Sequence, residues 1–124
     1  MDWMEIIGAH VMWKQRLMSF LAGNSAEALN PEMIRLDDRC ALGKWIYGDG
    51  KPMSQLPRYE EVRDLHAQFH QYAAEVVSLH VAGNTAEAEK LLQGDYSRLS
   101  EKLKHRIISL SQQVKSASDG IPRF

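Results

Sequence analysis

Apolar residues recur at helical spacing along almost the whole chain. Over residues 3–21 they fall three or four positions apart, and the same spacing returns over residues 58–82 and 92–114. No stretch alternates apolar and polar residues over more than a few positions, as a half-buried β-strand would. The sequence therefore predicts an all-α protein.

Turn signals divide these predicted helices. Gly23-Asn24 ends the first and Gly83-Asn84 ends the third, within the closely matching strings AGNSAEA (residues 22–28) and AGNTAEA (residues 82–88). We interpret the match as shared capping chemistry, with glycine after one helix and Ser or Thr before the next, rather than as a solenoid repeat. Ser25 is then a possible N-cap for a weak helical restart toward Pro31.

A second, short helix is predicted over about residues 38–47, capped by Asp37 or Asp38 and ended by the Gly- and Pro-containing segment 48–52. Three long helices, one short helix and brief connections predict an antiparallel four-helix bundle in which the additional short helix carries Cys40. We expect this bundle domain to span residues 1–115, followed by a polar C-terminal tail over residues 116–124.

The bulk composition excludes several classes of protein. The chain has 15 basic and 16 acidic residues among 124 and a net charge of -1, which favours neither a nucleic-acid nor a membrane partner. Its one cysteine has no internal disulfide partner, and the N-terminus lacks the basic and apolar regions of a signal peptide. We expect a soluble protein of a reducing, cytoplasmic compartment.

His66 and His70 are the first candidates for chemistry. At a spacing of four residues they project from the same side of the third long helix, so the two imidazoles could share one ion. They lie beside the apolar stripe and are expected to be at least half buried, where an imidazole needs a partner. By itself such a pair more commonly consists of core histidines that bond carbonyl or carboxylate groups, so more ligands are needed.

Two further side chains could complete a metal site. His10 lies within the apolar stripe of the first helix, and Cys40 lies near the start of the short helix, where backbone dipoles favour the thiolate. Gly43, inside that helix, suggests that another backbone approaches closely there.

Three imidazoles and one thiolate form a complete tetrahedral set for one Zn²⁺ per chain. Four protein ligands leave no open position for water, and Ala67 stands where a metalloprotease would carry its glutamate, so we expect no enzyme activity. A di-iron site is disfavoured because the Glu-x-x-His pattern is missing. His80 is too far along its helix to share the ion, and His105 lies off the apolar stripe.

The motifs His10-x-x-Trp13, Cys40-x-Leu42-Gly43-x-Trp45 and His66-x-x-x-His70 resemble those of the chemoreceptor zinc-binding (CZB) domain, in the same order. The resemblance extends over roughly residues 3–115. It implies a four-helix bundle that binds zinc through His10, Cys40, His66 and His70 in a bacterial cytoplasmic signalling protein. Such domains regulate chemoreceptors or diguanylate cyclases, often as homodimers.

We therefore expect a domain that senses zinc, or an oxidant such as hypochlorous acid at Cys40. No methyl-accepting coiled coil or cyclase domain follows in the sequence, so we expect output to a partner in trans. Two alternatives remain at this point: a zinc-dependent hydrolase with a metal-bound water, and a metal-free helical interaction module with ordinary core histidines.

Overall fold

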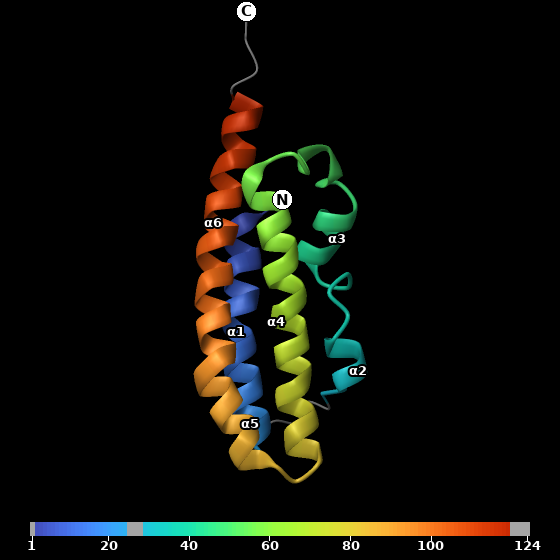
Figure 1. Cartoon of the computed structure of the whole chain (residues 1–124), viewed down its shortest axis with the longest axis vertical. Coiled ribbons are helices and arrows are strands. Elements are labelled where there is room, and N and C mark those ends of the chain that lie inside the picture. Colours follow the sequence, from blue (N-terminus) through green and yellow to red (C-terminus); the bar gives the residue numbers. More distant parts are fainter. Residues whose placement is uncertain (1, 25–28, 120–124) are drawn as a thin grey trace, which may run out of the picture.

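Helices α1 (Trp3–Leu21), α4 (Pro57–Val81) and α6 (Ser97–Asp119) form the long axis of the computed structural model, which describes residues 2–24 and 29–119. Figure 1 shows α1 and α4 running in one direction and α6 returning beside them. The fourth side consists of the short helices α2 (Pro31–Ile34) and α3 (Ala41–Tyr47), which lead back along α4 to the 3-10 helix η1 (Lys51–Met53). No strand occurs in the described residues, and the all-α prediction is confirmed.

The predicted stop signals end two of the long helices. Gly23 and Gly83 have φ angles of 75° and 87°, in the left-handed region where glycine is strongly favoured. The amide of Asn24 then donates to the Ser19 carbonyl, and that of Asn84 to the Leu79 carbonyl. The two glycines thus perform the same capping role. The N-cap expected at Thr85 is wrong, because Asn84 takes that position and makes no side-chain cap hydrogen bond. The proposed Ser25 N-cap lies outside the described residues.

The short helix that carries Cys40 begins later than predicted. Asp37 and Asp38 do not cap it; Cys40 itself is the N-cap of α3, with extended backbone and with Sγ accepting from the Gly43 amide. Helix α2 was not predicted, although Asn30 caps it through its side chain and Pro31 occupies its first turn. These two capping signals are present in the sequence, but a helix of four residues is too short to show the apolar periodicity that identifies a helix.

The last long element is one helix with an irregular turn. Helix α5 (Thr85–Leu91) continues through the π-helical turn η2 (Leu92–Tyr96) into α6. Helix α6 extends to Asp119, so the segment predicted as a polar tail begins inside the helix.

Helix α4 buries two adjacent faces. One face packs toward α6 and η2. The Arg58 amide donates to Gln113 Oε1 of α6 at 3.1 Å, and Glu61 pairs with Arg106 of α6. The ring of Phe69 lies 5.3 Å from that of Tyr96 in η2. This face and α6 supply eight residues of the buried apolar core, namely Val62, Leu65, Phe69, Val76, Leu99, Leu103, Ile107 and Leu110. The second face carries His66, His70, Ala73 and Val77.

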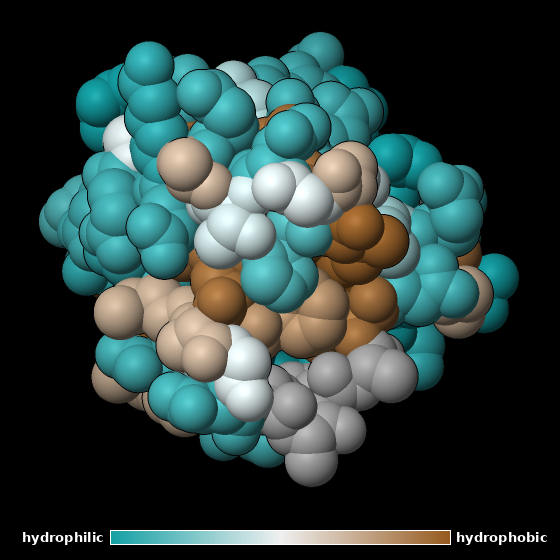
Figure 2. All heavy atoms as spheres, turned by 90° about the horizontal axis from the view of Figure 1, so that it is seen from below, coloured by the Kyte–Doolittle hydropathy of each residue, from teal (hydrophilic) through white to brown (hydrophobic). Residues whose placement is uncertain are grey.

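The surface is mostly hydrophilic at the end where α1 and α4 finish, but apolar atoms gather in a central patch there (Figure 2). At the end of α4, Val81 is 68% exposed. Crossing a bilayer takes a long run of apolar residues that none of the described helices contains.

Candidate metal centre

The four predicted ligands meet in one place. One ligand atom each from His10, Cys40, His66 and His70 lies within 4.8 Å of the other three. They come from the middle of α1, the N-cap of α3 and two successive turns of α4. All three histidines are buried, and Cys40 is partly exposed.

The spacing of these atoms suits a small tetrahedral cation. His66 Nε2 lies 2.9 Å from His70 Nε2 and 3.2 Å from Cys40 Sγ, and His70 Nε2 lies 3.7 Å from Cys40 Sγ. Around a zinc ion with ordinary bond lengths, nitrogen pairs are separated by about 3.3 Å and a nitrogen–sulfur pair by about 3.6 Å. Small adjustments would seat one ion.

Backbone carbonyls orient two of the imidazoles. His10 Nδ1 lies 2.9 Å from the Ile6 carbonyl oxygen, and His70 Nδ1 lies 2.8 Å from that of Ile34. Because a carbonyl oxygen only accepts, each Nδ1 carries the proton and each Nε2 keeps its lone pair. This carbonyl support is usual for metal-binding histidines. The Ile34 contact also ties the end of α2 to the site.

His66 has no comparable support. Its Nδ1 is buried and has no hydrogen-bond partner among the described residues, and the residue is 0% exposed. Its polar contacts are therefore those of Nε2 with Cys40 and His70. Because His70 Nε2 keeps its lone pair, this contact is a hydrogen bond when His66 Nε2 carries the proton, and a cation bound between the two nitrogens would replace that proton.

Gly43 positions Cys40 in two ways. Its amide donates to Cys40 Sγ at 3.4 Å, and a Cβ atom added at Gly43 would lie 1.8 Å from the Asp37 carbonyl oxygen. The close backbone approach expected at this glycine is confirmed. Tyr47 secures the same loop by donating to Asp37 at 2.6 Å, a bond that raises the pKa of Tyr47 to about 12.

Burial keeps the histidines in the form that binds metal. Desolvation lowers the pKa of all three rings, in the case of His66 to about 2, with the neighbouring rings of His70 and His10 contributing. Burial also raises the pKa of the Cys40 thiol, outweighing the backbone amides that lower it. The backbone amides at the helix N-terminus favour the thiolate as expected, but burial outweighs them, so the metal-free thiol must release its proton when a cation binds.

The remaining histidines lie elsewhere. His80 Nδ1 contacts Thr85 Oγ1 at 2.9 Å and its ring packs on Phe20, whereas His105 is exposed beside Glu101. Phe69, predicted only as a core residue, packs its ring on His10 and His70 at 5.2 and 5.7 Å. Sequence reasoning also missed the Ile34 carbonyl, because backbone partners leave no side-chain signal.

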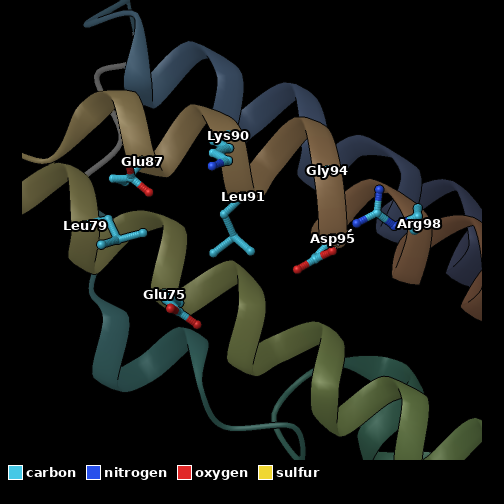
Figure 3. Close-up of a pocket in the computed structure, with 8 residues that line it drawn as sticks. All are labelled: Glu75, Leu79, Glu87, Lys90, Leu91, Gly94, Asp95 and Arg98. Atoms are coloured by element: carbon cyan, nitrogen blue, oxygen red, sulfur yellow. Dashed lines mark hydrogen bonds and ion pairs between the residues drawn. The ribbon is translucent and has the colours of Figure 1, made fainter.

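Two surface pockets differ in their relation to this site. A pocket of about 320 Å³ is lined by Cys40 and His70 together with apolar side chains of α1, α2 and the following loop. A larger one, of about 510 Å³, lies between α4 and the α5–η2 segment and contains none of the four candidate ligands (Figure 3).

Fold and site together define a small helical domain with a four-donor nitrogen and sulfur metal centre. Residues 10–77, more than half of the chain, match the family model of the chemoreceptor zinc-binding domain. The chain belongs to this family and is a zinc-binding signalling domain; the family is one of signalling domains, not of enzymes. Comparison with curated proteins and with solved structures returned no match. The four-residue cluster is compatible with one Zn²⁺.

Proposed function

We propose that His10, Cys40, His66 and His70 bind one Zn²⁺ and that the state of this site controls the packing of the α2–α3 segment against α1 and α4. The observation that carries the proposal is the convergence of four soft or borderline donor atoms from three helical segments. The ion, when bound, supplies the positive charge that satisfies these donors and joins the segments. Apart from the chain connections between them, only non-covalent contacts join these segments when no ion is bound.

The protein residues divide the work of holding the site. The Ile6 and Ile34 carbonyls keep the His10 and His70 rings in the ligand tautomer, and the Gly43 amide holds the sulfur of Cys40. Loss of the ion would leave the His66 and His70 nitrogens facing each other at 2.9 Å. The α2–α3 segment, which contacts the centre through Cys40 and Ile34, would then shift most readily.

An oxidant is the second proposed input. Hypochlorous acid would oxidise the Cys40 thiolate by two electrons to a sulfenic acid: the sulfur gains the hydroxyl group of the oxidant, and the chlorine leaves as chloride with the electron pair. A sulfenic acid is a weaker metal ligand than a thiolate, so coordination would change. The partial exposure of Cys40, beside three buried histidines, supports this as the reactive member of the set.

Homodimerisation through α1 is the third part of the proposal. The exposed apolar residues Met4, Val11 and Met18 are spaced by seven, and Met12 lies beside them. The exposed residues of α1 from Gly8 onward are uncharged, whereas Glu5 beside Met4 is exposed and Lys14, one turn from Met18, is partly exposed. A face with so few charges can meet its own copy across a two-fold axis with little opposition of like charges. Output would pass from this assembly to a chemoreceptor or a diguanylate cyclase in trans, within the cytoplasm.

Metal analysis of the purified protein tests the core of this proposal. We expect about one zinc per chain in the wild type, a sharp fall in His66→Ala, and an unchanged content in His105→Ala, the matched control at an exposed histidine. Unchanged folding and oligomeric state after chelation would instead favour a metal-free interaction module. Metal-bound water in a cobalt-substituted sample would favour a hydrolase.

The two other parts have separate tests. If hypochlorous acid leaves both Cys40 and the coordination unchanged, the oxidant input is wrong. Light scattering after size exclusion tests the dimer: Met12→Glu should give monomers, whereas Ile108→Glu, at an exposed apolar site of α6, should behave as the wild type.

A further inference from the structure

The pocket of about 320 Å³ beside the candidate metal centre opens at the surface and has Cys40 in its wall. Its walls include Trp13, Met33, Ile34 and Leu36, and it also contacts Cys40 and His70. Met33 is 55% exposed and His70 only 5%. The pocket therefore runs inward from the exposed side chain of α2 to two of the proposed ligands.

The walls of this pocket are almost free of charge. Arg39 is its one ionic lining residue; that side chain is 67% exposed and lies 3.5 Å from Asp38, with which it pairs. The larger pocket in Figure 3 is different, because Glu75, Glu87 and Asp95 share it with Lys90 and Arg98. An ion entering the pocket beside Cys40 would lose hydration without gaining a buried counter-charge, which is unfavourable.

We propose that this pocket is a binding site for small uncharged electrophiles and oxidants, which it holds against the sulfur of Cys40 while excluding charged ones. The inference deepens the proposed function, on which it rests for the role of Cys40 as the reactive ligand. It identifies the class of molecule that reaches the centre, and it makes Met33 and Leu36 determinants of that selectivity.

Methanethiosulfonates of different charge test the selectivity directly. The Cys40 sulfur attacks the sulfenyl sulfur of the reagent, a mixed disulfide forms, methanesulfinate leaves with the electron pair of the broken S–S bond, and the thiol proton goes to solvent. Because Cys40 is the only cysteine, intact mass reports its reaction alone. The probes are the uncharged methyl, the cationic trimethylammonioethyl and the anionic sulfonatoethyl reagents.

Each rate is divided by the rate with the same chain unfolded in guanidinium chloride, which removes differences in intrinsic reactivity. For the folded, chelator-treated protein we expect the uncharged reagent to be favoured over both charged ones by at least about tenfold. Equal normalised rates for the three reagents would overturn the proposal. So would a preference for the anionic reagent, which would indicate steering by Arg39 instead.

One substitution inside the pocket and one outside it test the location. Met33→Trp fills the pocket and should slow the uncharged reagent at least about fivefold, whereas Val81→Trp, at a residue that is 68% exposed at the end of α4, should leave the rate unchanged. Leu36→Trp serves as a second filling variant if circular dichroism shows that Met33→Trp is misfolded. Equal rates in the filled and control variants would contradict the proposal.

The result of this test does not depend on whether the protein binds zinc. The rates are measured on metal-free protein, so the selectivity can hold even if metal analysis shows no zinc in the purified chain. Conversely, a full zinc content with no selectivity among the reagents would refute the pocket and leave the metal site standing.

Discussion

Helix α4 buries two adjacent faces whose partners differ in kind. Toward α6 it presents Val62 and Leu65, which belong to the same buried apolar cluster as the leucine and isoleucine side chains of that helix. Toward α1, α2 and α3 it presents His66 and His70, which meet His10 and Cys40. The first face is stabilised by apolar burial and needs no ligand. The second face holds buried nitrogen and sulfur atoms that one cation could bind together, so the stability of this face depends on whether an ion is bound.

Removing the metal should loosen one face of α4 and leave the other unchanged. After chelation we expect amide exchange in α2 and α3 to rise by at least about tenfold, equivalent to about 1.4 kcal/mol of local opening free energy. The segment of α6 that contacts α4 should keep its protection. Hydrogen exchange with mass spectrometry measures both, and equal loosening of α6 would break the comparison.

Acid should weaken the same face in the metal-free protein. The folded-state pKa of His66, about 2, lies below its ordinary value of 6.5, so the unfolded chain binds more protons between these values. The stability is therefore fully present above pH 6.5 and falls as the pH is lowered toward 2. Urea unfolding at several pH values checks this, with His66→Leu as the variant that should flatten the part of the slope below pH 6.5.

Truncating a side chain in the apolar interface between α4 and α6 should lower the stability of the fold without changing zinc binding. Leu103 is 1% exposed in α6, so Leu103→Ala should lower the free energy of unfolding by about 2–5 kcal/mol. We expect nearly the same loss with and without zinc, because the cavity lies on the other face of α4. Urea titrations in both conditions measure it; a zinc content below that of the wild type would show that the faces are coupled.

Gly43→Ala should lower the free energy of unfolding by less than Leu103→Ala does, and it should disturb the face that carries the candidate metal ligands. The added Cβ collides with the Asp37 carbonyl, and such overpacking typically costs about 1–3 kcal/mol. The loop must move, and Cys40 moves with it, so zinc affinity should fall as well. Competition with a chromophoric chelator measures the affinity, and Gly94→Ala, where an added Cβ would meet only the Arg98 side chain at 3.9 Å, is the control.

The smallest effect is expected for the ion pair that links α4 and α6 at the surface. Arg106 pairs with Glu61, which lowers the pKa of that carboxyl, but both side chains are about one-third exposed. Arg106→Gln should cost no more than about 1 kcal/mol. Thermal unfolding measures the change, and a larger loss would mean that charge contributes to the face that we describe as apolar.

The long helices and the four candidate ligands were predictable from the sequence, because period and residue type carry that information. Leu103 and Ile107 are four residues apart, which predicts that they share a buried face of their helix. His66 and His70 have the same spacing and lie on one side of α4. The carbonyl of Ile34 was not predictable, since any residue supplies one. The N-cap role of Cys40 was missed because a sulfur cap is unusual beside Asp37 and Asp38.

X-ray absorption at the zinc edge of the zinc-loaded protein tests the central claim most directly. We predict about three nitrogen neighbours at about 2.0–2.1 Å and one sulfur at about 2.3 Å per zinc. The sulfur contribution should disappear in Cys40→Ser. A zinc environment without sulfur in the wild type, or one unchanged in that variant, would contradict the site described above.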